Sequence, residues 1–182
     1  MNTNQQYNQA IESCKIIFLQ KTKDYGTSWR VYRTISVADQ IYIKAKRIRN
    51  VQETGVQKIS DDIISEFKGI LNYGIIGLIQ LDITDDELED LPYQMVEQLY
   101  NDKVIIAKQL MEDKNHDYGE AWREMSQESF VDLILGKILR IKQILINKGK
   151  TIISEGIDAN FYDIINYAAF GLILIAEEKH GS

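Results

Sequence analysis

The sequence predicts an all-α fold made of two tandem repeats, and three observations support it. Apolar residues recur with helical spacing throughout, and no segment shows the convincing period of two that a strand requires. Only one proline, Pro92, occurs in 182 residues, so little interrupts long helices. The run Lys114–Arg123 also has a near twin in Lys21–Arg30, in which Lys, Asp, Tyr, Gly, Trp and Arg recur at an offset of 93.

The match extends beyond this run, which makes the chain a duplication of a unit of roughly 90 residues. One inserted residue moves the offset from 93 to 94 along the way. The recurring pairs include Ser36 and Ser129, Asp39 and Asp132, Lys44 and Lys137, Arg47 and Arg140, Phe67 and Phe161, Asn72 and Asn166, Tyr73 and Tyr167, and Gly77 and Gly171. We place the repeats at 1–90 and 91–182 and expect a pseudo-twofold axis between them, because closed twofold pairs are the commonest assembly.

The first repeat should contain three helices. One runs from about 5 to 22 and ends at the signature run, which is interrupted by Gly26. The second is capped by Ser36 and runs to about Asn50, and the third is capped by Ser60 or Asp61 and runs to about Leu81. Gly74 and Gly77 on the third helix predict a close approach of another helix.

The second repeat should follow the same plan after an acidic, solvated connector at 82–90. Its helices are expected at about 92–113, 127–148 and 158–178, with the signature run as a loop between the first two. The most apolar stretch, Ile164–Ala176, carries Asn166 and is too short to span a bilayer, so we expect a buried helix.

The composition limits which kinds of binding partner and which cellular compartment we expect. The net charge is −6, so the chain has no global basic footprint for duplex nucleic acid, although a small phosphorylated ligand needs only a local cluster. The single Cys14 and the absence of a signal peptide or membrane segment fit the cytoplasm. The sequence is compatible with a homo-oligomer.

Charged residues lie on one stripe of the apolar helix at 127–148. Ser129, Asp132, Gly136 and Arg140 share this stripe. The stripe is either a structural ion pair between helices or the lining of a polar pocket, because unpaired buried charges are very costly. We expect Asp132 and Arg140, like their twins Asp39 and Arg47, to face inward.

A second group of carboxylates lies at the start of the last helix. Glu155 and Asp158 are one turn apart, with Asp163 nearby; they are either helix caps or ligands of Mg²⁺. Asp61 stands at the position of Glu155, but Ile64 and Gly69 replace Asp158 and Asp163. The second repeat should therefore keep any metal site, and the first should have lost it.

The signature run contains aromatic and positively charged side chains that are candidates for binding a ligand. Tyr118 and Trp122 could stack on a base or fill the core, and Lys114 and Arg123 could contact phosphate. His116 has no twin and is expected to be an exposed loop residue.

Four runs, 115–123, 132–142, 155–158 and 163–167, resemble the nucleotide modification associated domain 1 family, found in bacteria and phages. The resemblance implies a role in nucleotide or modified-base metabolism. The candidate nucleotide-binding residues are Lys114, Asp117, Tyr118, Trp122, Arg123, Lys137, Arg140 and Asn166.

A looser similarity is to the all-α nucleoside triphosphate pyrophosphatases of the MazG-like and dimeric dUTPase group. It implies a Mg²⁺-dependent pyrophosphohydrolase in which Glu155, Asp158 and Asp163 hold the metal and Asp132, Glu155 and Asp158 are catalytic. Glu155 and Asp158 match one of the group's acidic pairs, whereas the other pair is missing. The alternative is a non-catalytic nucleotide-binding or partner-assembly module.

Overall fold

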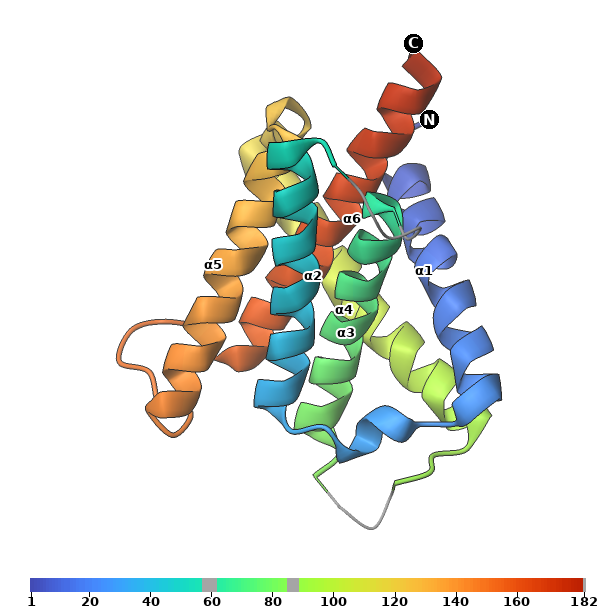
Figure 1. Cartoon of the computed structure of the whole chain (residues 1–182), viewed down its shortest axis with the longest axis vertical. Coiled ribbons are helices and arrows are strands. Elements are labelled where there is room, and N and C mark those ends of the chain that lie inside the picture. The colour runs from blue at the N-terminus through green and yellow to red at the C-terminus, as the bar shows by residue number, and fades with distance from the viewer. Residues whose placement is uncertain (57–61, 85–88, 182) are drawn as a thin grey trace.

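The computed structural model describes residues 1–56, 62–84 and 89–181, and within these ranges it is helical without strands. This confirms the all-α prediction. The elements are α1 (Thr3–Tyr25), η1 (Ser28–Val31), α2 (Thr34–Thr54), α3 (Ile63–Asp82), α4 (Tyr93–Tyr118), η2 (Ala121–Glu124), α5 (Gln127–Ile146) and α6 (Ile157–Gly181) (Figure 1).

The helices form three layers, and each layer pairs one helix with its repeat twin. The middle layer is α3 with α6. On one side α2 packs on α3 and α5 packs on α6, with α2 and α5 in contact with each other (Figure 1). On the other side α1 and α4 each contact both middle helices. Both repeats thus contribute to one hydrophobic core.

The signature run is more helical than predicted. Helix α4 continues through Lys114 to Tyr118 and ends at Gly119, whose φ is 63° and ψ is 35°. This left-handed conformation favours glycine and is a common helix terminator. The predicted loop is therefore the last turn of α4, a glycine cap and the short helix η2.

Two predicted caps also differ. Helix α2 begins at Thr34, so Ser36 lies within its first turn and Arg33 precedes it. Helix α3 is capped by Asp62, whose side chain accepts a hydrogen bond of 2.8 Å from the backbone nitrogen of Ser65. Ser60 and Asp61 lie outside the described residues.

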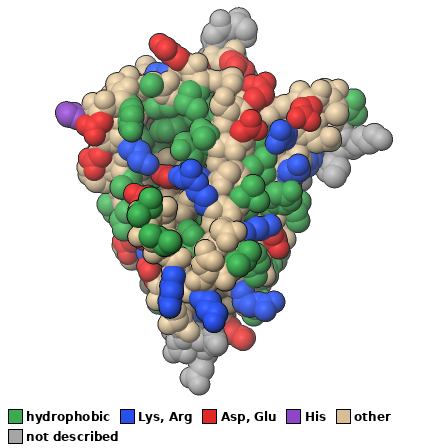
Figure 2. Space-filling model, turned by 90° about the vertical axis from the view of Figure 1, so that its left-hand side faces the viewer, with side chains coloured by type: hydrophobic (Ala, Val, Ile, Leu, Met, Phe, Trp, Pro, Cys, Tyr) green, Lys and Arg blue, Asp and Glu red, His purple; other side chains and the backbone are tan. Residues whose placement is uncertain are grey.

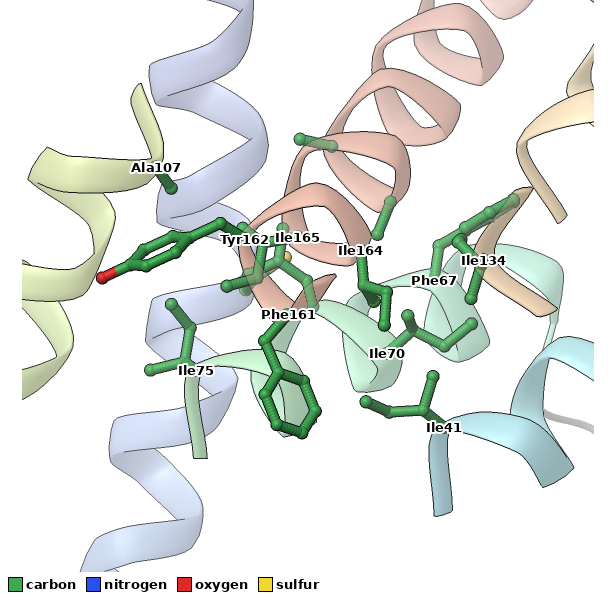
Figure 3. Packing of buried hydrophobic residues seen from close by; sticks show 14 of the residues in the cluster. Ile41, Phe67, Ile70, Ile75, Ala107, Ile134, Phe161, Tyr162, Ile164 and Ile165 are labelled. Carbon is green, nitrogen blue, oxygen red and sulfur yellow. The ribbon is translucent and has the colours of Figure 1, made fainter. Parts of the chain in front are cut away.

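The middle helices meet through glycines, as predicted. A methyl group on Gly77 would lie 2.6 Å from the ring of Phe161, and one on Gly171 would lie 2.9 Å from the ring of Phe67. Figure 3 shows Phe161 and Phe67 among the isoleucines of the core. These contacts are reciprocal, because Gly77 and Phe67 are the repeat twins of Gly171 and Phe161.

The buried polar contacts between the repeats are reciprocal too. The hydroxyl of Tyr7 donates to Oδ1 of Asn166 at 2.7 Å, and that of Tyr100 donates to Oδ1 of Asn72 at 2.8 Å. The two asparagines donate in turn to the carbonyls of Ala107 and Cys14, which are also twins. A local twofold axis would produce such reciprocity, although the axis itself stays a prediction.

Helix α6 is the core helix expected from its apolar sequence. Within the described residues, Ile157–Glu178 is the one stretch long and apolar enough to cross a membrane, and most of it is buried inside the protein. The core helices of ordinary domains pass the same test.

Candidate functional site

Two pockets occupy equivalent places in the two repeats. The first pocket, of about 420 Å³, lies between α1, η1, α2 and α3, and the second, of about 360 Å³, lies between α4, η2 and α6. The same types of residue line both at twin positions: Lys21 and Lys114, Tyr25 and Tyr118, Trp29 and Trp122, Asn72 and Asn166, and Tyr73 and Tyr167.

The signature run builds one wall of each pocket. In the second, the last turn of α4 supplies Lys114 and Tyr118, and Gly119 then turns the chain so that Trp122 enters the core. Trp122 is buried and stacks on Phe170, with ring centroids 4.1 Å apart and planes 7° apart. Tyr118, in contrast, is 74% exposed. The tryptophan fills the core, and the tyrosine ring is free to meet a ligand.

In the second pocket the carboxylate of Asp163 pairs with Lys114 of the same pocket and with Lys137 of a neighbouring cavity. Oδ1 of Asp163 lies 2.7 Å from Nζ of Lys114, and Oδ2 lies 2.8 Å from Nζ of Lys137. Burial alone would raise the pKa of Asp163, but the hydrogen bonds and charges of the two lysines outweigh it and lower this pKa. Burial alone would likewise lower the pKa of Lys114, yet the bond to Asp163 raises it. Asp163 and Lys114 are therefore held in their charged forms.

The first pocket lacks this carboxylate. Gly69 stands at the position of Asp163, and a methyl group on Gly69 would lie 3.0 Å from the Cδ and Cε atoms of Lys44. Nζ of Lys44 is 4.0 Å from Glu66, whose carboxylate is closer to Arg47, at 3.4 Å. With Lys21 and Lys68, the lining carries three lysines and one glutamate, a formal charge of +2.

The inward orientation predicted for Asp39 and Asp132 is wrong. Their side chains are 52% and 62% exposed. Asp39 lies 2.8 Å from Lys142, and Asp132 lies 3.9 Å from Arg49. Because α2 and α5 lie side by side, their charged stripes meet at the solvent edge of this contact. The ion-pair interpretation holds for these two aspartates, and the pairs are again reciprocal.

The two arginines differ, because the side chain of Arg47 is 22% exposed and faces inward as predicted, whereas Arg140 does not. Arg47 pairs with Glu66. Arg140 is exposed and lines a separate cavity of about 680 Å³ together with Glu155 and Lys137. Arg123 donates to Glu120, Glu177, Thr3 and Gln6, so it ties η2 to the ends of α1 and α6.

The predicted metal ligands do not converge on one point. Asp163 is held between two lysines, whereas Glu155 and Asp158 are exposed. Across the described ranges, no group of three or more His, Cys, Asp or Glu side chains is placed to hold a metal ion. The magnesium site stays a prediction, and these residues as placed do not form its cage. Asp117 is exposed and lies 3.2 Å from His116, which is exposed as predicted.

Sequence reasoning missed the charge of the first pocket. Glu66, Lys68 and Tyr73 line it without having been singled out as ligands. The replacement of Asp163 by Gly69 is visible in the sequence and predicts the loss of a metal ligand, whereas in the structure Asp163 is the partner of two lysines.

The surface that carries α5 borders the third cavity, which Lys137, Arg140, Lys150 and Glu155 line with the same formal charge of +2. Figure 2 shows Lys and Arg side chains there among acidic and hydrophobic ones.

Comparison with known proteins places the two repeats in one family. The model of nucleotide modification associated domain 1 matches the chain twice, over residues 21–81 and 114–175. Both matches include the lysine, tyrosine, tryptophan and asparagine of the pockets. No curated protein and no solved structure matches the chain significantly.

Proposed function

The chain belongs to the nucleotide modification associated domain 1 family, and from this premise we propose that it binds a nucleotide in the pockets lined by its signature residues. A nucleotide presents an anionic phosphate and a flat base. A binding pocket therefore needs cations beside aromatic surface.

One observation carries this proposal: twin pockets, each with lysine and exposed tyrosine at the same positions. In the first pocket Lys21, Lys44 and Lys68 provide cations, while Tyr25 and Tyr73 provide rings. Tyr25 is 64% exposed, so its ring is available for stacking. The volume of about 420 Å³ lies within the usual range for small-ligand pockets.

Binding has more support than Mg²⁺-dependent hydrolysis. The residues expected to be catalytic, Asp132, Glu155 and Asp158, lie at the surface and outside both pockets. Hydrolysis remains the alternative, and the same assay measures it.

The test is calorimetric titration of the full chain with nucleoside mono-, di- and triphosphates, with and without Mg²⁺, followed by analysis of the products. We expect saturable binding that Lys21→Ala weakens about tenfold, the loss of one charge-assisted contact. Asp132→Ala is the control, because its side chain is exposed on the α2–α5 edge. Absence of binding by any nucleotide to folded protein would refute the proposal, and release of pyrophosphate would favour the hydrolase.

A further inference from the structure

The two pockets differ in charge, and Gly69 in place of Asp163 removes the carboxylate that lines the second pocket. Glu66 and Lys68 also differ from their twins, Asn160 and Tyr162. Asp163 of the second pocket bridges Lys114, which lines the same pocket, and Lys137, which lines the neighbouring cavity, with N–O distances of 2.7 and 2.8 Å. Two ammonium groups held around two anionic oxygens make the arrangement that would also bind a phosphate. Asp163 thus occupies, from within the chain, the place of an anionic ligand.

The first pocket keeps the lysines without the internal anion. Lys21 and Lys44 are the twins of Lys114 and Lys137, and Gly69 has no side chain to place between them. Lys21 makes no ion pair within the described part of the chain. The carboxylate nearest to Lys44 is Glu66 at 4.0 Å, and Glu66 is shared with Arg47. The lysines of this pocket can therefore form ion pairs with an anion from outside the chain.

We infer that the first pocket is the open ligand site and takes a phosphate monoester, whereas Asp163 closes the second pocket to anions. The formal charge of +2 in the first pocket matches the dianion of a phosphate monoester at neutral pH. Tyr25 and Tyr73, together with the buried Trp29, form the surface beside it. Given the proposed function, on which this part rests, the ligand is a nucleoside monophosphate. The first repeat then carries the working site, and the second serves as its scaffold.

The experiment adds the internal carboxylate to the first pocket or removes it from the second. Inorganic phosphate and nucleoside monophosphates are titrated calorimetrically into the wild-type chain and into Gly69→Asp, with Gly136→Asp as the matched control. Gly136 is also helical and has open space around it, so its substitution adds the same charge outside both pockets. We expect one site per wild-type chain, a loss of at least about tenfold in Gly69→Asp, and no change in Gly136→Asp.

The reverse exchange tests the closed pocket. Asp163→Gly should raise the stoichiometry from one to two ligands, and Asp163→Asn, which preserves side-chain size, should do so if the glycine variant does not fold. Two sites in the wild-type chain, or equal affinity in the wild type and Gly69→Asp, would overturn the inference.

The probes separate this inference from the proposed function. Inorganic phosphate could bind the wild type but not Gly69→Asp, while nucleoside monophosphates bind no more tightly than phosphate. In that case the anion site stands and the nucleotide proposal fails. If nucleotides bind the wild type and Gly69→Asp equally well, the nucleotide proposal stands and the anion site in the first pocket fails.

Discussion

At the scale of single residues, the ion pairs of Asp163 give the second pocket a defined dependence on pH. Its pKa is lowered by Lys114 and Lys137, and the pKa of Lys114 is raised by Asp163. A lowered carboxylate pKa stabilises the fold above the ordinary value of about 4, and this stabilisation is lost as pH falls through the folded-state pKa. A raised lysine pKa stabilises the fold below about 10.4 and loses its effect as pH rises through the higher folded-state value.

Asp163→Asn should therefore lower the free energy of unfolding by about 2 kcal/mol between about pH 5 and about pH 9, less than for a fully buried pair because Lys114 is half-exposed. The difference from the wild type should vanish as pH falls below the usual aspartate range. Urea denaturation of both proteins across pH measures it. A difference that grows in acid would contradict the assigned ion pairs.

The one cysteine should be chemically inert in the folded chain. Cys14 is fully buried, and burial raises the pKa of its thiol to about 12. Since the thiolate is the reactive form, alkylation should be very slow in native protein and fast in urea. A thiol-reactive dye followed by absorbance measures both rates, and rapid native labelling would show that the α1 packing is wrong.

At the scale of elements, the glycines of the middle layer set how closely α3 and α6 approach. Gly77→Ala places its methyl group 2.6 Å from the ring of Phe161, which is fully buried and cannot move freely. We expect a loss of about 1–3 kcal/mol in the free energy of unfolding, measured by denaturant titration.

Gly136→Ala is the matched control on α5. Nothing lies within 4 Å of the added methyl group, and alanine is the better helix former, so this variant should gain about 0.5–1 kcal/mol. Equal changes in the free energy of unfolding for Gly77→Ala and Gly136→Ala would show that the close approach of α3 and α6 does not depend on Gly77.

The elements also mark where sequence reasoning succeeds and where it stops. Helical periodicity and the two signature runs are local properties, and they predicted the helices and the duplication. Gly119 is equally local, yet its role as a cap set the end of α4 five residues beyond Asp113, the predicted end. The orientation of Asp132 depends on how α2 lies against α5, and the charge of Lys114 depends on a carboxylate 49 residues later in the chain. Neither relation can be read from spacing within one helix.

At the scale of the whole molecule, the buried hydrogen bonds between the repeats occur in equivalent pairs, whereas the charges of the two pockets do not. Tyr7 and Tyr100 bond to Asn166 and Asn72 in twin environments, and all four residues are buried. Tyr7→Phe and Tyr100→Phe should each cost about 1 kcal/mol, and their costs should agree within about 0.5 kcal/mol. Thermal or denaturant unfolding of the pair measures this, and clearly unequal costs would speak against a twofold relation between the halves.

The fused repeats have a consequence for how this chain could change during evolution. A single-copy protein that paired with itself would carry the same residue at the position of Gly69 and Asp163 in both of its pockets. Every mutation there would open or close both at once. Once two copies share one chain, each pocket has its own codon at that position. Selection can then preserve packing in both copies while allowing one of them to exchange its ligand for a side chain.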